Sequence, residues 1–419
     1  MTGNPARRGT VLLTDASYPA RLTLGPAFVT GYQAEHIRRI NAVPEASILE
    51  NIPNILDTIL GGGYYVVGFV LLLGVLIVVH EVGHFLVAKV LDVKVLKFSI
   101  GFPPAIVKRK WGETEYILSG TPLGGYVKLL GEDPESKEEI PPEDEHRAFV
   151  NKPLLSRTAI IIAGPLANYL LALVLFCGAY VVGLPVLSTN IGKILPDSPA
   201  REAGLGPGDR VVAINGTKVW RWDDMRSTIE KSAGKKLAIT VERGGNRVDL
   251  SVTPTLGDQK DLFGNRLGRI GVMPSGERVK LGLAASLYEG FRFTLQTTDL
   301  MIVMLVKIVK GEASPKNLGG PIAIAQASGE SLKQGLFAFI FLVSLISINL
   351  AIINLFPIPV LDGGHLLFFL VEAVIRRPVT GKAREAATFA GLLLIGLLTV
   401  FIFYNDIMRI VTQGWSLQP

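Results

Sequence analysis

The chain has 419 residues, of which 49% are hydrophobic and 19% are charged, and its mean hydropathy is +0.40. This mean hydropathy is high for a soluble protein and indicates several apolar spans beside a polar portion. The net charge of +6 comes from scattered basic residues without a nucleic-acid-binding signature, so we expect no nucleic-acid partner. A single cysteine, Cys177, excludes an internal disulfide and a multi-cysteine zinc site, and we interpret it as a small core residue.

Four apolar segments are long enough to span a bilayer, which takes about 20 residues. They are Tyr64–Ala88, Thr158–Leu184, Leu336–Phe356 and Phe389–Ile410. Basic residues follow the first segment, precede the second and separate the third from the fourth: Lys89, Lys94, Lys97, Lys152, Arg157, Arg376, Arg377, Lys382 and Arg384. Because basic flanks stay in the cytoplasm, both termini and the segment between the second and third spans should lie outside it. The sequence therefore predicts a polytopic α-helical membrane protein with about four transmembrane helices.

Residues 1–60 are predicted to be an N-terminal extension that precedes the membrane core. Residues 1–50 contain no apolar run of the kind found in a signal peptide, so we expect no cleavable signal. Either this stretch is native, or translation starts further downstream at a codon such as that of Val43. The membrane core is expected in two parts, residues 61–187 and residues 334–419.

The segment after the first span predicts a membrane-associated β-hairpin or small sheet. Val93–Ile100 and Tyr116–Leu130 are rich in β-branched and aromatic residues and are interrupted by glycines and prolines. The acidic stretch Glu132–Glu145 follows and is expected to be an exposed loop.

The sequence of residues 188–257 predicts a soluble α+β domain. From the basic residues that flank the spans, we expect this domain to lie outside the cytoplasm. Its landmarks are Ser198-Pro199-Ala200, Ala203-Gly204-Leu205, Gly208-Asp209 and Ile214-Asn215-Gly216, followed by a helix over Trp222–Ala233 and strands over Lys236–Arg243 and Arg247–Thr253. This order resembles a single PDZ domain of bacterial proteases. Residues 258–333 are expected to be a linker with an amphipathic helix, Leu283–Lys310, which lies at the membrane interface or packs on the spans.

The first span contains the motif His80-Glu81-Val82-Gly83-His84. Residues four apart share one face of a helix, so the two imidazoles can bind one zinc ion. Glu81 lies beside them and can accept a proton from a water molecule that attacks a carbonyl group. Two histidines and a glutamate inside a bilayer are costly unless they act together, which favours a metal site over a polar cluster that joins helices.

A catalytic zinc usually takes three protein ligands, so a third must come from elsewhere in the chain. The best region is Asn354–His365 at the end of the third span, which contains Asp362 and His365. Either side chain could bind the metal, and chemistry alone leaves both open. Asp362 beside Gly363-Gly364 also fits a turn or a helix cap.

Together these segments resemble the bacterial site-2 protease family of intramembrane zinc metalloproteases, and within it the RseP-like group. The resemblance covers about residues 64–412 and rests on His80–Phe85, Gly164–Asn168, Asn349 and Asn354–His365, with further matches at Phe98–Phe102 and Gly124–Val127. It implies one zinc ion bound by His80, His84 and Asp362, with Glu81 as the general base, and so favours Asp362 over His365. The chain departs from the family in having one PDZ-like domain where some members have two, and in its first fifty residues.

The resemblance also implies the substrate and the compartment. The expected activity is hydrolysis of peptide bonds in transmembrane segments of single-span proteins of the bacterial cytoplasmic membrane, after a first cut outside the cytoplasm. Anti-sigma factors and signal-peptide remnants are substrates of this kind. The PDZ-like domain would then bind a peptide C-terminus or act as a size filter.

Substrate binding is expected where the third span is interrupted. Pro357 and Pro359 break the helix and leave backbone groups and Asn354 free to bind an unwound substrate, while the predicted hairpin could supply a sheet edge. For Gly164–Asn168 we expect helix packing. A membrane-anchored PDZ adaptor with a degenerate metal site is disfavoured because the metal motif is intact, and a serine protease because no G-x-S-x-G motif occurs.

Overall fold

The computed structural model describes residues 52–132, 140–182, 186–260, 266–279, 281–312, 319–377 and 379–413. Most of the predicted N-terminal extension, and with it the expectation that no signal peptide is present, lies outside these residues. The middle of the acidic stretch predicted as a loop also lies outside them, and its end forms the 3-10 helix η2 (Pro142–Arg147), followed by η3 (Phe149–Asn151).

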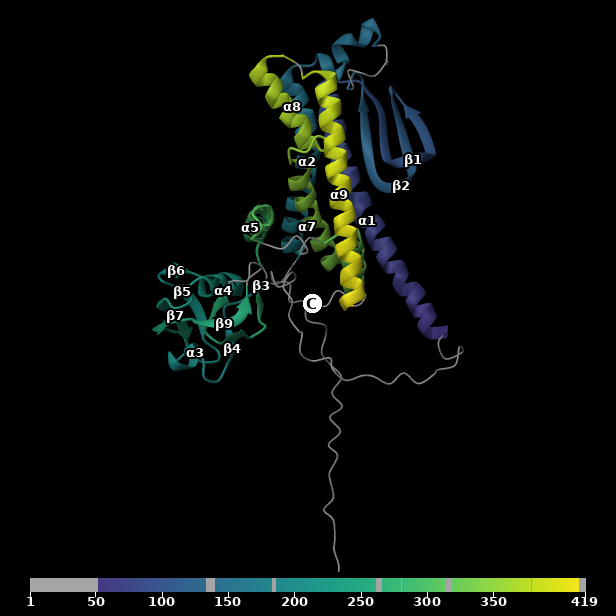
Figure 1. The fold of residues 1–419 in the computed structure, drawn as a ribbon. Helices are drawn as coiled ribbons and strands as arrows, with labels where there is room; N and C mark the ends of the chain where they lie inside the picture. Colours follow the sequence, from purple (N-terminus) through teal and green to yellow (C-terminus); the bar gives the residue numbers. More distant parts are fainter. Residues whose placement is uncertain are drawn as a thin grey trace, which may run out of the picture.

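Four helices of the described chain are long and apolar enough to cross a membrane, as predicted. They are α1 (Ile52–Val90), α2 (Leu154–Val182), α7 (Leu336–Asn354) and α9 (Gly381–Gln413). The helices form an elongated bundle (Figure 1). Only 6% of the most apolar stretch of α9 is buried by the rest of the described chain, as expected for a helix that faces lipid on most sides.

Helix α2 lies at the centre of this bundle. Its Phe176 is 1% exposed and contacts Phe293 of α5 (Leu283–Val309) and Phe341 of α7, with ring centroids 4.9 and 5.5 Å apart. Leu72 and Leu76 of α1 are fully buried in a cluster with residues of α7. Two of the predicted spans are thereby held against α7, which precedes the interrupted segment.

The predicted amphipathic helix is α5, and it packs on α2. The hydroxyl of Ser286 donates a hydrogen bond to the carbonyl oxygen of Tyr180 at 3.2 Å. Gly290 approaches the same helix so closely that a Cβ atom there would lie 2.5 Å from the Cα of Cys177. The sequence left two locations open for this helix, at the membrane interface or packed on the spans. The structure shows it packed on α2, one of the spans.

Two helices lie where none was predicted. Helix α6 (Pro321–Gln334) occupies the end of the expected linker, and α8 (Asp362–Ile375) follows the interruption after α7. The backbone amides of Gly320, Ile322 and Ala323, at the start of α6, donate to the carboxylate of Asp406 in α9 at 3.0–3.2 Å, which joins the last span to the bundle.

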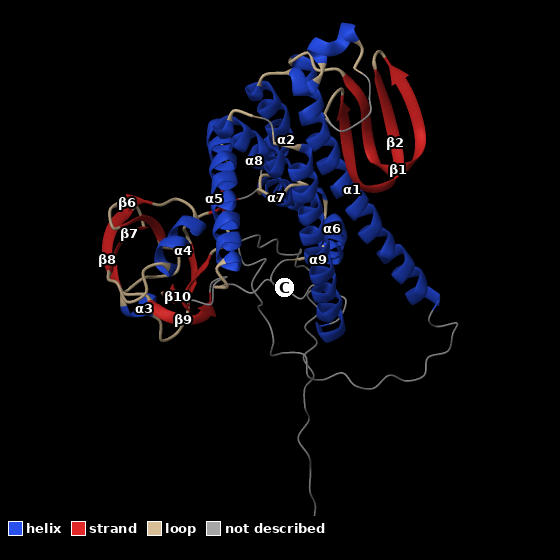
Figure 2. Ribbon diagram, turned by 45° about the horizontal axis from the view of Figure 1, so that its top comes forward, coloured by secondary structure: helices blue, strands red, loops and turns tan. Residues whose placement is uncertain are grey.

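The predicted hairpin is a sheet of two long, bent strands, β1 (Val95–Trp111) and β2 (Thr114–Leu129). Lys97–Ile100 pairs with Gly125–Lys128 on one side and with Glu115–Leu118 on the other. The glycines and prolines expected to end the strands instead shift the register between Ile100 and Ala105. Figures 1 and 2 show the folded sheet lying along α1.

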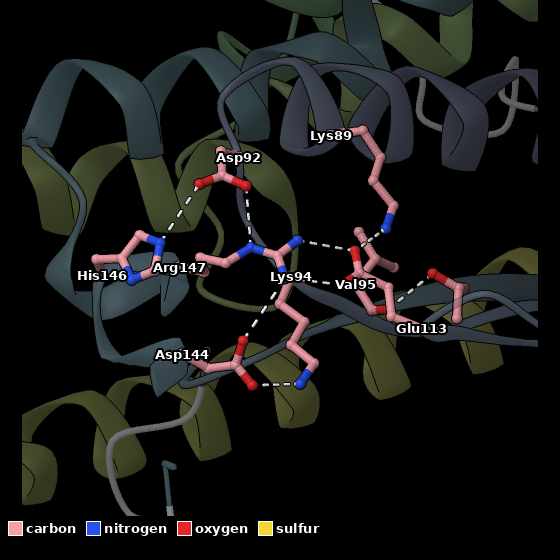
Figure 3. A network of polar contacts seen from close by, with 9 residues as sticks. Lys89, Asp92, Lys94, Val95, Glu113, Asp144, His146 and Arg147 are labelled. Carbon is pink, nitrogen blue, oxygen red and sulfur yellow. Dashed lines mark hydrogen bonds and ion pairs between the residues drawn. The ribbon is translucent and has the colours of Figure 1, made fainter. Parts of the chain in front are cut away.

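Charged residues anchor the base of this sheet to the end of α1 (Figure 3). Arg147 of η2 donates two hydrogen bonds to Glu113 in the β1–β2 turn, at 2.8 and 2.9 Å, and one to Asp92 at 2.9 Å. Lys89 at the end of α1 also pairs with Glu113. The hydrogen bonds from Arg147, aided by Lys89, lower the pKa of Glu113 to about 2, so this carboxylate is charged near neutral pH and holds the turn beside α1.

The soluble domain extends beyond the predicted limits of residues 188 and 257. Strand β3 (Val186–Leu187) pairs with β12 (Arg278–Val279), and β4 (Ile191–Ile194) pairs with β11 (Val272–Pro274). Because these last strands return to the first ones, residues up to 279 belong to the domain, although the linker was expected to begin at residue 258.

The main sheet of the domain has the order β6-β5-β7-β8. The remaining elements are α3 (Pro199–Glu202), β5 (Arg210–Ile214), β6 (Thr217–Lys218), α4 (Trp222–Glu230), β7 (Leu237–Arg243), β8 (Asn246–Val252), β9 (Thr255–Lys260) and β10 (Arg266–Arg269). The helix and both strands predicted here are confirmed. Figures 1 and 2 show the domain and the β1–β2 sheet at opposite ends of the helical bundle.

Candidate metal centre

Three side chains from two distant segments converge inside the bundle. His80 and His84 come from α1, and Asp362 is the first residue of α8. His80 Nε2 lies 3.2 Å from His84 Nε2 and 3.2 Å from Asp362 Oδ2, while His84 Nε2 lies 3.6 Å from Asp362 Oδ1. Across the described residues, this is the one set of three or more metal-binding side chains close enough to share an ion.

Helix geometry and close packing orient the two imidazoles. The rings are one turn apart on α1, with centroids 4.8 Å apart. Gly164 of α2 leaves room for His84, because a Cβ atom there would lie 2.2 Å from His84 Nε2. His84 Nδ1 lies 2.8 Å from the carbonyl oxygen of Ile160 and donates to it, so Nε2 is free to face the cluster.

The interruption after α7 delivers Asp362 to the histidines. Helix α7 ends at Asn354, and the chain turns through residues 355–361, which include both predicted prolines, before α8 begins. This turn packs tightly on the start of α8: a Cβ atom on Gly363 would lie 2.2 Å from the carbonyl oxygen of Phe356. The glycines after Asp362 therefore allow a close backbone approach that any side chain would block.

The arrangement fits a zinc ion. With zinc–nitrogen and zinc–oxygen distances of about 2.0–2.1 Å, tetrahedral ligand atoms lie about 3.3 Å apart. The observed separations are 3.2–3.6 Å. Asp362 Oδ2 is buried without a hydrogen-bond partner in the described structure, as expected of an oxygen reserved for a metal. Two histidines and one carboxylate also leave a fourth position for water or substrate.

The other predicted site residues surround this cluster. Glu81 is 9% exposed and packs closely against β2. A Cβ atom added to Gly125 of β2 would lie 2.8 Å from the Cγ atom of Glu81. Asn354 Nδ2 lies 3.5 Å from His80 Nε2. Pro357 and Pro359 lie in the turn that precedes Asp362. His365, the alternative ligand, is not part of the three-residue group.

Two contacts of the histidines were not predicted. Asn168, expected only to pack helices, has its Nδ2 3.4 Å from His80 Nδ1. The segment Gly164–Asn168 was the available signal for this contact. The carbonyl oxygen of Ile160 contacts His84, and since every residue has such an oxygen, no side-chain pattern could reveal it.

A helical membrane fold with two histidines and a carboxylate converging inside it defines the class of membrane-embedded metalloproteases. The model of Peptidase family M50 matches residues 68–398, well over half of the chain. The chain belongs to this family, and the predicted resemblance to site-2 proteases is confirmed.

The names of three relatives that match most of the chain agree on the metal and the reaction. The chain is 36% identical over 364 residues to the "Putative zinc metalloprotease Atu1380" of Agrobacterium fabrum, covering 83% of this chain and 96% of that protein. It is 36% identical over 363 residues to the "Putative zinc metalloprotease Cj1068" of Campylobacter jejuni, covering 85% and 97%. It is 31% identical over 420 residues to the "Zinc metalloprotease RasP" of Geobacillus kaustophilus, covering 82% and 98%. The chain is a zinc-dependent metalloendopeptidase of a membrane.

Proposed function

We propose that this protein is an intramembrane endopeptidase that hydrolyses peptide bonds within the transmembrane segments of single-span membrane proteins. The observation that carries the proposal is the convergence of His80, His84 and Asp362 on helices of membrane-spanning length. Both histidines belong to the candidate span Gly62–Val90, and Asp362 follows the candidate span Leu336–Asn354. Ionisable residues at such positions are costly in a bilayer unless they serve a function.

His80, His84 and Asp362 are the proposed ligands of one zinc ion, which when bound acts as a Lewis acid on the scissile carbonyl group and on water. Glu81 is the proposed general base, which accepts a proton from the attacking water and returns it to the departing amine. Asn354 can donate a hydrogen bond from its amide to the carbonyl oxygen of the substrate as negative charge develops there.

A transmembrane helix must unwind before its peptide bonds become accessible, and an extended peptide pairs readily with a sheet edge. Across the described strands, Gly125–Val127 pairs with β1 along one edge only, and Gly125 lies against Glu81. A substrate strand added to this edge would run beside the proposed base. Backbone groups around Pro357 and Pro359, which lack a helical pattern, are the proposed second contact.

We place residues 186–279 and both termini outside the cytoplasm of a bacterial cell, because basic residues flank the other ends of the spans. A single PDZ-like domain there would select substrates already cut on the outside, by binding their new C-terminus or by excluding bulky domains. The domain is fixed to the membrane core, since Arg221 pairs with Glu289 of α5 and the two residues are 5% and 1% exposed. These features support regulated intramembrane proteolysis of substrates such as anti-sigma factors or signal-peptide remnants.

A cleavage assay in liposomes, with a single-span substrate already trimmed on its outer side, tests the proposal. Wild-type protein should cut within the transmembrane segment, and a zinc chelator should stop the reaction until zinc is restored. Glu81→Gln should retain zinc but cleave about 10²- to 10⁴-fold more slowly. Glu143→Gln, which changes an exposed glutamate of η2, should cleave like wild type. Wild-type cleavage by Glu81→Gln, or cutting only outside the membrane, would contradict the proposal.

A further inference from the structure

A fully buried amide lies beside the candidate metal centre and belongs to none of the proposed ligands. Asn168 of α2 is 0% exposed, and its Nδ2 lies 3.4 Å from His80 Nδ1. Its backbone oxygen accepts a hydrogen bond from the hydroxyl of Ser347 in α7 at 2.7 Å, which fixes this part of α2 against α7. Its side-chain oxygen, Oδ1, is buried and has no hydrogen-bond partner in the described part of the chain. Buried amide oxygens without a partner are rare in folded proteins.

The ring of His80 turns one nitrogen to the metal cluster and the other to Asn168. Nε2 lies 3.2 Å from Asp362 Oδ2, so Nε2 is the atom that would bind a metal. A neutral imidazole that binds a metal through Nε2 carries its proton on Nδ1, which is then a donor that needs an acceptor. In the observed orientation the amide of Asn168 presents Nδ2, which is also a donor.

We propose that Asn168 is a positioning residue for zinc, whose amide oxygen accepts the Nδ1 proton of His80 when His80 Nε2 binds the metal. A turn of the amide by about 180° exchanges Oδ1 and Nδ2, which have nearly the same size. After this turn, the Nδ1–H group of His80 faces an acceptor instead of a second donor. Asn168 Oδ1, which had no partner in the described structure, then accepts a hydrogen bond. Because Asn168 is fully buried, bulk solvent does not compete for the contact.

The other histidine already has a partner of this kind. His84 Nδ1 donates to the carbonyl oxygen of Ile160 at 2.8 Å. Histidine ligands almost always donate their second ring N–H to an oxygen, which fixes the ring and raises its basicity. With Asn168 in this role, both imidazoles have matched acceptors on α2, one from the backbone and one from a side chain. The inference rests on the proposed zinc ligands and adds the residue that orients one of them.

Two substitutions separate the acceptor role from packing. Asn168→Leu keeps a similar size and removes the acceptor, whereas Asn168→Asp keeps the acceptor and removes the donor. Zinc affinity is measured on purified protein by competition with a chromophoric chelator, and the ligand geometry by the visible spectrum of the Co²⁺-substituted protein. Asn168→Leu should lower zinc affinity about 10- to 100-fold and change the Co²⁺ spectrum, while Asn168→Asp should resemble wild type in both. Ser344→Ala removes a buried hydroxyl that donates to the carbonyl oxygen of Ile340 in its own helix at 2.8 Å, and should change neither.

Wild-type zinc affinity in Asn168→Leu would overturn the inference. A loss in Asn168→Asp as large as that in Asn168→Leu would overturn it as well, because a donor role of the amide would then be the cause. If Asn168→Leu does not fold, Asn168→Asp still tests the inference, since zinc affinity well below wild type in this variant would show that the amide acts as a donor. His80→Ala identifies a different failure: if it binds zinc as tightly as wild type, the proposed ligand set is wrong, whatever Asn168 does.

Discussion

Gly164→Ala should remove zinc from this protein, although it adds a single methyl group to a helix that is not expected to supply a ligand. The new Cβ atom would lie 2.2 Å from His84 Nε2, whereas ordinary contacts begin at 3.4 Å. The imidazole or the helix must therefore move by about 1 Å, the difference between these two distances. Metal sites tolerate deviations of only about 0.2 Å in ligand distance, so His84 cannot keep its place in the cluster.

The expected loss of zinc affinity is at least about 100-fold, the upper end of what the loss of a supporting contact usually causes. Helix propensity acts in the opposite direction, since alanine is favoured over glycine in a helix by about 1 kcal/mol. Metal content by mass spectrometry and a chelator competition titration measure the loss directly. Gly178→Ala is the matched control, because it lies in the same helix and a Cβ atom there has nothing within 4 Å.

Gly178→Ala should bind zinc like wild type and unfold at the same or a slightly higher temperature. If Gly164→Ala also binds zinc within about threefold of wild type, less than the loss of even a supporting contact, the close approach of α2 to His84 does not shape the metal site. The geometric argument for this glycine would then fail, while the proposed ligands would still stand on their own tests.

Three further changes have defined outcomes. Asp362→Ala should lose zinc while His365→Ala retains it, and equal zinc content in Asp362→Ala and wild type would rule out the aspartate as a ligand. Glu289→Ala should lower the free energy of unfolding by about 1–3 kcal/mol in chemical denaturation, because buried Arg221 loses one of its two carboxylate partners and keeps only Asp224; Glu242→Ala, which breaks an exposed pair, should cost less than about 1 kcal/mol. Glu113→Gln should lower the melting temperature near neutral pH. Since the pKa of Glu113 is about 2 in the folded protein and 4.5 ordinarily, its stabilisation is complete above pH 4.5 and is lost as the pH falls toward 2. The melting temperatures of variant and wild type should therefore converge over that range, and a difference independent of pH would contradict this reasoning.

The spans and the metal motif could be predicted because their signals are local. A run of apolar residues is sufficient to identify a membrane helix, and spacing by four is sufficient to place His80 and His84 on one face. All four predicted segments form helices long and apolar enough to cross a membrane, and their ends lie within four residues of the prediction except the start of the last, which lies eight residues earlier, at Gly381 instead of Phe389. The choice of Asp362 over His365 as a ligand came from the family resemblance and stays a prediction; among the described residues, Asp362 lies in the cluster with the two histidines and His365 does not.

Helices α6 and α8 were missed because their sequences lack a clear helical pattern. Small residues such as Ala323, Ser328 and Gly329 fill the buried face of α6, since neighbouring helices approach it closely. The first residue of α8, Asp362, is followed by two glycines, which are poor helix formers and are required by the turn that packs on them. The end of the soluble domain was missed for a related reason, because strands of two to four residues carry almost no pattern of their own.

The sequence by itself determined that this is a membrane protein with a zinc motif in its first span, since hydrophobicity and helical spacing act over short stretches of chain. Only the tertiary structure shows where Asp362 lies relative to the two histidines. It brings Asp362 to His80, which precedes it by 282 positions in the chain (362 − 80), by breaking a span and packing a glycine pair beneath the turn. It also supplies the environment of the proposed ligands: the space beside Gly164, the carbonyl oxygen of Ile160 and the amide of Asn168. Such contacts depend on which helices meet and at what depth, and that is set by packing between segments far apart in the chain.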